Sequence, residues 1–271
     1  MRAASQEALE GAKARWEAAL RQESGREIGL GCELFALADL IRREGALSKA
    51  LTDTSRSGED RSSLASAILA SKVSAPVEEL FAGLVAEKWA DERDLAEAIE
   101  ELGVDAVLAR AQATRRLHAV EEELYRASRL LADERDLRIA LSDEAIDVER
   151  RLELARGVWS GRVGEETLAL TERAVRRVDA STLASSLRRY VDAAAALQRR
   201  LVASVTVAAP LTRGQEVRLT RTLSARYGTD VSLHVAIDPD VIGGMRIHVG
   251  DDVIDATLAN RIKGVKDAIK R

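Results

Sequence analysis

The sequence has 271 residues, of which 46% are hydrophobic, 32% charged and only 3% aromatic, and its formal net charge is −4. This composition disfavours a nucleic-acid-binding protein, which usually carries a basic excess and aromatic side chains for base stacking. The single cysteine, Cys32, excludes an internal disulfide. No stretch reaches the ~20 apolar residues that cross a bilayer, and the charged N-terminal segment lacks a signal-peptide core. We therefore expect a soluble chain that meets a membrane only through other proteins.

Residues 1–200 predict helix almost throughout. A first helix is expected at about residues 5–21. Apolar side chains then recur at the spacing of one helix face, as in the run Leu34, Leu37, Ala38 and Ile41. Residues 95–131 contain no proline and one glycine, Gly103, which favours one long helix shared by two bundles.

The helical part repeats itself with an offset of 90 residues. The segment ELFALADLIRREGALSKALTD, which starts at Glu33, aligns without a gap with ELYRASRLLADERDLRIALSD, which starts at Glu123. Chance agreement between two amphipathic helices would match apolar positions but not loop residues such as Asp53 and Asp143. The repeat therefore predicts two similar helical bundles in tandem, at residues 1–112 and 113–200. The first helix has no second copy.

Residues 201–271 have the composition of a small α/β domain. LVASVTVAAP predicts a strand that ends at a proline, and the next segment predicts a helix with Thr212 as its N-cap and Gly228 as its stop. Alternating apolar residues predict strands at 231–237 and 245–249, followed by a shorter strand and a closing basic helix. The predicted protein is mostly α: two tandem helical bundles, then an α/β domain with a mostly antiparallel sheet.

The histidines and the cysteine do not have the spacing of a catalytic or metal site. His118 is far in sequence from His234 and His248. These last two are interpreted as exposed residues on the polar faces of neighbouring strands, and the alternative is that they approach each other. Cys32 has no base partner to activate it and is interpreted as a small buried residue. We expect no catalytic residue, no metal and no cofactor.

Three other features are explained by ordinary structural roles, in turns, at a strand start and on solvated helix faces, and we prefer these explanations to functional ones. Turns favour aspartate, which explains the acidic residues Asp238, Asp240, Asp251, Asp252 and Asp255 more readily than a metal site does. The pair Gly243 and Gly244 begins a strand and lacks the pattern of a phosphate loop. Arginine pairs on the helices are interpreted as solvated faces because they alternate with carboxylates; they are Arg115–Arg116, Arg176–Arg177, Arg188–Arg189 and Arg199–Arg200.

The last quarter of the chain carries a family motif. An alternating strand is followed by Asp-Pro, an aliphatic pair, Gly-Gly, a second strand, Gly-Asp and Val-Ile-Asp. Its residues here are Asp238, Pro239, Gly243, Gly244, Gly250, Asp251, Val253, Ile254 and Asp255. This region closely resembles the C-terminal region of the F-type ATP synthase delta subunit, whose mitochondrial relative is the oligomycin-sensitivity-conferring protein. Ala256 departs from the usual glycine. The second repeat is similar to the family's N-terminal helical domain, and the extra copy is similar to enlarged actinobacterial members.

The resemblance implies a non-catalytic stator subunit that couples proton flow to ATP synthesis. It would link the alpha and beta subunits of the catalytic head to the b subunits of the peripheral stalk. The helical domain would bind N-terminal helices of alpha subunits, and the C-terminal region would bind the ends of the b subunits. It would lie at the cytoplasmic face of the bacterial plasma membrane, held there only through the complex, with no nucleic-acid partner.

A partner-binding groove is expected on the first bundle. We predict that it is lined by Trp16, Leu80, Leu84 and Trp89, and ordinary core packing is the alternative for each of them. Because two tethered modules raise avidity, we also predict that the duplication adds a second contact on the head, with a second alpha subunit. The rival hypotheses are a nucleic-acid-binding helical protein and a small-molecule enzyme with its site in the C-terminal domain.

Overall fold

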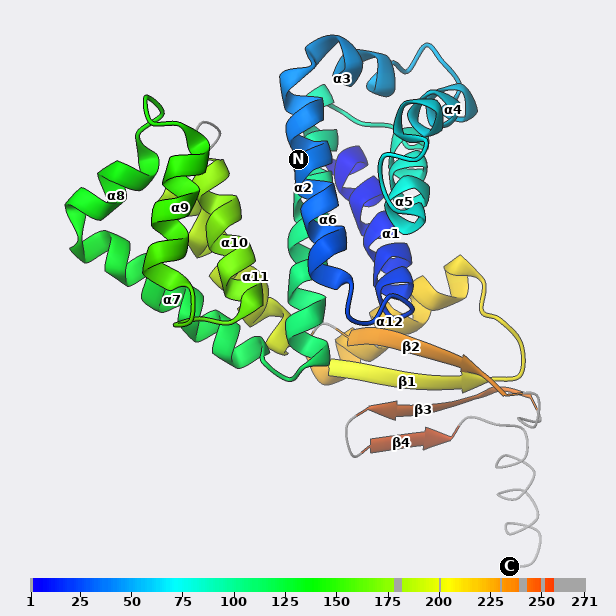
Figure 1. Cartoon of the computed structure of the whole chain (residues 1–271). Coiled ribbons are helices and arrows are strands. Elements are labelled where there is room, and N and C mark those ends of the chain that lie inside the picture. Colours follow the sequence, from blue (N-terminus) through cyan, green and yellow to red (C-terminus); the bar gives the residue numbers. More distant parts are fainter. Residues whose placement is uncertain are drawn as a thin grey trace, which may run out of the picture. The chain divides into compact units, whose positions relative to one another are not determined.

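The computed structural model describes residues 2–177, 182–199, 201–229, 231–238, 243–249 and 252–255. Its contacts divide the chain into two compact units, Met1–Ala194 and Ala195–Arg271. The first is helical, and the second contains a small mixed sheet (Figure 1). The predicted mostly helical fold with a small sheet near the C-terminus is confirmed.

The first unit is built from short amphipathic helices joined by tight turns (Figure 1). They are α1 (Ala3–Leu20), α2 (Glu27–Arg43), α3 (Gly45–Thr52), α4 (Gly58–Leu69), α5 (Ala75–Ala86), α6 (Glu92–Ala113), α7 (Leu117–Asp133), α8 (Arg135–Ser142), α9 (Val148–Trp159), α10 (Glu165–Arg176) and α11 (Leu183–Arg199), which contains the boundary between the units. Local sequence fixes several starts: the side chains of Ser57, Asp91 and Asp147 each accept a hydrogen bond from a backbone N–H of the first turn.

The helix boundaries follow the 90-residue repeat. Each of α7, α8, α9 and α10 begins and ends 90 residues after α2, α3, α4 and α5. Backbone conformation repeats as well: Gly25 and Arg115 both have positive φ, at 89° and 57°, and so do Ser71 and Gly161, at 60° and 73°. The turns are therefore preserved between the copies even where one copy lacks the glycine that suits them.

One long helix over residues 95–131 was a wrong prediction. The helix α6 ends at Ala113, and the left-handed Arg115 turns the chain into α7. The N–H of Arg116 donates to Ala111 O at 2.7 Å and that of Arg115 to Gln112 O at 3.1 Å. This pair of bonds is a Schellman motif, which ends a helix without proline or glycine in the sequence.

The helices α2 and α6 pack closely because each has a glycine at the crossing. A Cβ added to Gly31 would lie 2.9 Å from Gly103 O, and one added to Gly103 would lie 2.6 Å from Phe35 Cε1. Both distances are too short for a Cβ, so Gly31 allows the backbone of α6 to approach α2, and Gly103 leaves room for the Phe35 ring. Around this crossing, buried leucine, alanine and valine side chains from α1 to α6 form one core.

The second unit is a four-stranded sheet with α12 (Arg213–Tyr227) packed on it. Its strands β1 (Leu201–Val207), β2 (Val231–Ile237), β3 (Met245–Val249) and β4 (Asp252–Asp255) lie in the order β2-β1-β3-β4. Two strand pairs are antiparallel, as predicted. The pair β1–β2 is parallel, because the chain returns through α12 to the end of the sheet where β1 begins, and β2 then runs in the same direction as β1. Buried Val205, Ile247 and Val249 and the helix residue Leu223 form its core.

The cap and strand predictions for this unit hold in most places. Thr212 N-caps α12, its N–H donating to Gln215 Oε1 at 2.7 Å, and Gly228 ends the helix at φ 68°. His234 and His248 do not lie on neighbouring strands, however: each is the register partner of Ser204, on opposite sides of β1. The predicted closing helix lies outside the described residues.

Candidate functional site

The four residues predicted to line a groove lie inside the core of the first repeat. Trp16, Leu80, Leu84 and Trp89 all belong to its buried cluster, and Trp16 is 1% exposed. Both indoles are also paired internally, since Trp16 Nε1–H donates to Leu102 O at 3.0 Å and Trp89 Nε1–H to Leu84 O at 2.8 Å. In the chain by itself these residues pack the core beneath α1 and α5, which is the alternative that the sequence left open.

The strongest polar arrangement in the helical unit lies where the two repeats meet. Arg173 of α10 donates to both oxygens of Asp39 on α2, each at 2.7 Å, and through Nε to Glu100 Oε1 on α6 at 3.0 Å. Arg173 Cζ also lies 4.9 Å from the ring centroid of Phe35. A single guanidinium therefore joins three helices, two of them from the first repeat.

Glu100 is the acceptor at the centre of this network. It is 1% exposed, and Arg42, Arg173 and Arg177 each place a nitrogen within 3.3 Å of its carboxylate. Tyr190 of α11 points its hydroxyl at the same group from 3.5 Å. Several donors on one buried carboxylate satisfy its lone pairs, which a burial this complete requires.

The close packing of these buried charged groups shifts their pKa values. Burial acts to raise the pKa of Glu100, but the hydrogen bond from Arg173 and the charges of Arg173, Arg177 and Arg42 outweigh it and lower the pKa to about 2. For Arg42, burial and then repulsion from Arg177 lower the pKa. Burial, followed by the charge of Glu100, raises the pKa of Tyr190 to about 12. Glu100 is thus ionised and Tyr190 neutral at neutral pH, so the network is a fixed salt bridge and not a proton-transfer site.

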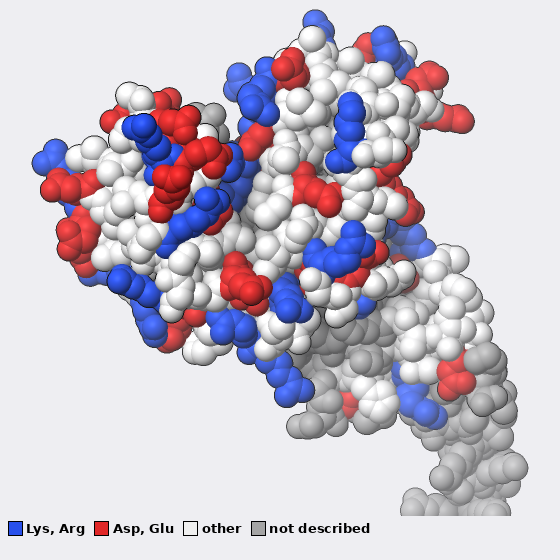
Figure 2. Space-filling view, in the orientation of Figure 1, with Lys and Arg blue, Asp and Glu red and all other residues white. Residues whose placement is uncertain are grey.

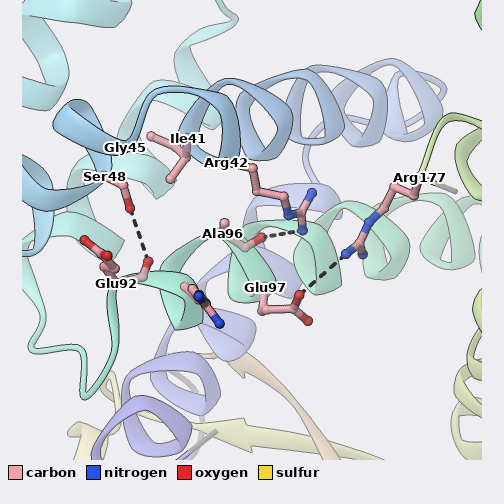
Figure 3. A pocket seen from close by; sticks show the side chains of 9 residues that line it. Ile41, Arg42, Gly45, Ser48, Glu92, Ala96, Glu97 and Arg177 are labelled. Atoms are coloured by element: carbon pink, nitrogen blue, oxygen red, sulfur yellow. Dashed lines mark hydrogen bonds and ion pairs between the residues drawn. The ribbon is translucent and has the colours of Figure 1, made fainter. Parts of the chain in front are cut away.

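A polar cavity of about 300 Å³ lies beside this network, where α2 and α3 meet the start of α6 (Figure 3). Arg42 crosses from α2 to the carbonyl of Ala96, and Arg177 reaches Glu97. The hydroxyl of Ser48 donates to the backbone carbonyl of Glu92 at 3.3 Å and not to a base. The lining therefore holds charges of both signs but no activated nucleophile.

Sequence reasoning missed this network and misjudged two of the residues around it. Arg177 was assigned to a solvated face, yet it is 3% exposed. Cys32 was expected to be buried, yet it is exposed on α2. The residues Asp39, Glu100 and Arg173 come from three distant helices, and only the internal alignment offers a signal. It places Arg173 opposite Gly83, an unusual change from no side chain to a long charged one.

The C-terminal motif is described only in part. Asp238 follows β2, and its N–H donates to Val207 O at 2.9 Å. Gly243 and Gly244 have φ of 65° and 83°, a conformation that favours glycine at both positions. They therefore make the turn into β3. Pro239, Gly250 and Asp251 lie outside the described residues.

The last part of the motif forms the edge strand β4. In its register Val253 pairs with His248, Ile254 with Ile247 and Asp255 with Arg246. Ile254 packs against the core of the sheet. Of the aspartates that were predicted to lie in turns, Asp238 directly follows β2, whereas Asp252 and Asp255 are the first and last residues of the strand β4. Asp240 and Asp251 lie outside the described residues.

No further site of a chemical kind emerges from the part of the chain that the structure describes. Within it, no group of three or more His, Cys, Asp or Glu side chains is placed to hold a metal ion. None of its helices is both long enough and apolar enough to cross a bilayer. On the face seen in Figure 2, acidic and basic side chains are interspersed over the helical unit, unlike a nucleic-acid-binding surface.

Comparison with known proteins identifies relatives along nearly the whole chain. The family model described as "ATP synthase delta (OSCP) subunit" matches residues 104–269. "ATP synthase subunit delta" of Beutenbergia cavernae is 38% identical over 263 residues, which is 97% of each chain. "ATP synthase subunit delta" of Salinispora arenicola is 41% identical over 239 residues, 88% of this chain and 87% of its own. Similar relatives occur in Streptomyces.

The solved structures add little to this. A chain in the cryo-EM structure of the Toxoplasma gondii mitochondrial ATP synthase hexamer covers 62% of this chain and 95% of itself, with 20% identity and a TM-score of 0.28. That similarity is too slight to carry an argument about the fold. The family model begins within α6 and so covers the second repeat and the C-terminal unit, whereas the bacterial relatives match the first repeat as well.

Proposed function

The chain belongs to the ATP synthase delta (OSCP) subunit family, whose members are non-catalytic stator components of F-type ATP synthase, and we propose that it links the catalytic head to the peripheral-stalk b subunits. Its contribution to ATP synthesis and proton transport is mechanical. While the rotor turns, the head experiences a counter-torque, and this subunit holds the head in place.

The observation that carries this proposal is the buried network around Glu100. A connector under torque must not yield between its parts, and Arg173 joins α10 of the second repeat to α2 and α6 of the first through paired hydrogen bonds. Buried, well-oriented charge pairs hold a specific geometry even where they add little net stability. The network thus makes the two helical repeats move together.

For the partners, we propose the division that the family resemblance implied. Alpha-subunit N-terminal helices, with adjoining parts of the beta subunits, bind the helical unit, at a surface formed by α1 and α5 over Trp16, Leu80, Leu84 and Trp89. The b subunits bind the C-terminal region that contains Asp238, Gly243, Gly244 and β4. In domain terms, residues 1–112 are the extra copy, 113–200 the second bundle and 201–271 the C-terminal domain. The protein is peripheral, held at the cytoplasmic face of the plasma membrane by the complex.

Reconstitution tests this function. Membrane vesicles that retain the membrane sector and b subunits, but are stripped of the head and of this subunit, are supplied with purified head and with or without the full chain. We expect head binding and ATP-driven proton pumping only when the chain is present, while ATP hydrolysis by the soluble head stays unchanged. Equal pumping without the chain, or no association of the chain with head or vesicles, would refute the proposal.

A further inference from the structure

The polar cavity between α2, α3 and the start of α6 contains a buried arginine with unused donors. Arg177, the residue that follows α10, lines this cavity and is 3% exposed. Its Nε and Nη1 have no hydrogen-bond acceptor among the described residues. Nη1 lies 3.3 Å from Glu100 Oε1 only as an ion pair, and Nη2 reaches Glu97 Oε1 at 3.5 Å. Buried donors without an acceptor are rare, because each has lost its bond to water without a replacement.

The charged groups beside the cavity do not balance. Each member of this group lies within ion-pair distance of another: the arginines are Arg42, Arg173, Arg177 and Arg189, and the carboxylates are Asp39, Glu97 and Glu100. The group therefore has one more formal positive charge than negative. The other charged residues of the lining, Arg93 and Glu92, cancel each other. Arg42 and Arg177 point toward one another (Figure 3), and burial followed by repulsion from Arg177 lowers the pKa of Arg42.

The rest of the lining suits a small anion. Gly45, the first residue of α3, borders the cavity, and no side chain caps the start of this helix. The first N–H groups of a helix lack partners within it and favour an anion. The hydroxyl of Ser48 also borders the cavity. The volume of about 300 Å³ is at the small end of the range for ligand pockets, ~300–1,000 Å³.

We propose that this cavity binds a phosphate-type oxyanion, which accepts hydrogen bonds from Arg177 and is attracted by Arg42 and by the start of α3. Guanidinium groups bind phosphate oxygens by charge-assisted hydrogen bonds. An oxyanion also has several acceptor oxygens, so one ion can reach donors on different helices, which a halide ion in a cavity of this size cannot do. Free inorganic phosphate and the phosphate group of a nucleotide share this chemistry, and they are distinguished by experiment.

The bound anion joins the two repeats. Gly45 and Arg42 belong to the first repeat, whereas Arg177 follows the last helix of the second. At the positions 90 residues away, Glu87 corresponds to Arg177 and Ala132 corresponds to Arg42, so neither arginine has a basic counterpart. The site is therefore a property of the junction and not of each repeat. Because it concerns binding by the chain alone, the inference does not depend on the stator role.

Isothermal titration calorimetry of the full-length chain tests the site. Sodium phosphate is titrated at constant ionic strength, and sodium chloride and ADP are titrated separately. We expect saturable binding of one phosphate per chain and no binding of chloride. Binding of ADP but not of phosphate, if Arg177→Gln removes it, would assign the site to the phosphate group of a nucleotide. If neither phosphate nor ADP binds, or if chloride binds as well as they do, the inference is wrong.

Two substitutions locate the bound anion. Arg177→Gln removes the buried charge. Gly45→Asp places a carboxylate in the first turn of α3, and it is expected to fold because an added Cβ meets nothing within 4 Å and an acid suits a helix start. Each variant should bind phosphate roughly tenfold or more weakly, since one loses charge-assisted hydrogen bonds and the other adds a like charge.

Gly29→Asp is the matched control. Gly29 is an exposed glycine in the first turn of α2, at the opposite end of that helix from Arg42, and an added Cβ there also meets nothing within 4 Å. This variant should bind phosphate as the wild type does. Wild-type affinity in Gly45→Asp, or an equal loss of affinity in Gly29→Asp, would contradict a site in this cavity.

Hydrogen exchange shows where the anion acts. In the wild type, phosphate should slow exchange in α3 and at the end of α10, because it holds these two segments together, and Gly45→Asp should abolish the effect. Slowing that is confined to other helices, or that persists in Gly45→Asp, would refute an anion at the junction of the repeats.

Discussion

Arg61 and Arg151 are equivalent residues of the two repeats, and each donates a hydrogen bond from the first turn of one helix to a backbone carbonyl at the end of another. Arg61 Nε donates to Val85 O at 3.0 Å, and Arg151 Nη1 donates to Val175 O at 3.2 Å. The donors are 90 residues apart, and so are the acceptors. Duplication therefore preserved a buried arginine whose role is to satisfy helix C-terminal carbonyls, a role that no hydrophobic residue can take over.

Replacing Arg61 should destabilise the fold more than replacing Arg151 does. Arg61 is 3% exposed and donates to five carbonyls, those of Val85, Asp53, Arg56, Ala86 and Glu87. Arg61→Met is expected to lower the free energy of unfolding by about 3 kcal/mol, because buried acceptors lose charged donors. Arg151→Met, with fewer such bonds, should cost about half as much. Urea denaturation of both variants checks this, and equal losses would contradict it.

Breaking the ion-pair network between the repeats should strongly lower the free energy of unfolding. Arg173→Met leaves Asp39 and the buried Glu100 without their closest cation, and we expect a loss of about 3–5 kcal/mol in the free energy of unfolding. The control is Arg156→Met, which breaks the exposed pair with Glu172 and should cost less than about 1 kcal/mol. Hydrogen exchange should also accelerate in α10 for the first variant only. Similar effects of the two variants would show that Arg173 has no special role.

The low pKa of Glu100 predicts loss of stability in acid. Its folded-state pKa, about 2, lies below the ordinary value of 4.5, so the stabilisation is fully present above pH 4.5 and is lost as the pH falls toward 2. At ~1.4 kcal/mol for each pKa unit, this amounts to about 3 kcal/mol for this largely buried group. Glu100→Gln should be less stable at pH 7 and show a flatter stability profile between pH 5 and 2. Parallel profiles for wild type and variant, measured by denaturation, would exclude this carboxylate as the source.

Glycine should stabilise two turns whose counterparts already have it. Arg115 and Ser71 have positive φ and exposed side chains, while Gly25 and Gly161 occupy the equivalent positions. Arg115→Gly and Ser71→Gly relieve left-handed strain of ~1–2 kcal/mol and lose part of this to the greater freedom of the unfolded chain. We expect a net gain of about 0.5–1 kcal/mol for each. Gln112→Gly, inside α6, should instead cost about 1 kcal/mol. Thermal denaturation should therefore rank the two turn variants above the wild type and Gln112→Gly below it. Any other order would contradict the turn assignment.

Much of this architecture could be predicted from local pattern. Apolar spacing fixes which face of a helix is buried, and Thr212 and Gly228 mark the ends of α12 by their own conformational preferences. The 90-residue repeat gave the order of helices in one copy from the other. Even so, the end of α6 at Ala113 was missed, because arginine is a poor guide to a left-handed position and only the Schellman bonds reveal it.

The sequence by itself determined the family, the helical repeat and the small C-terminal sheet, since each is visible as a pattern along the chain: a motif, a 90-residue offset and an alternation of apolar residues. Only the tertiary structure decided that Trp16 and Trp89 are core residues, that Arg177 is buried, and that Glu100 meets Arg173. The physical reason is that burial and ion pairing between distant helices depend on which faces pack together, and periodicity specifies that a face is apolar without specifying its partner.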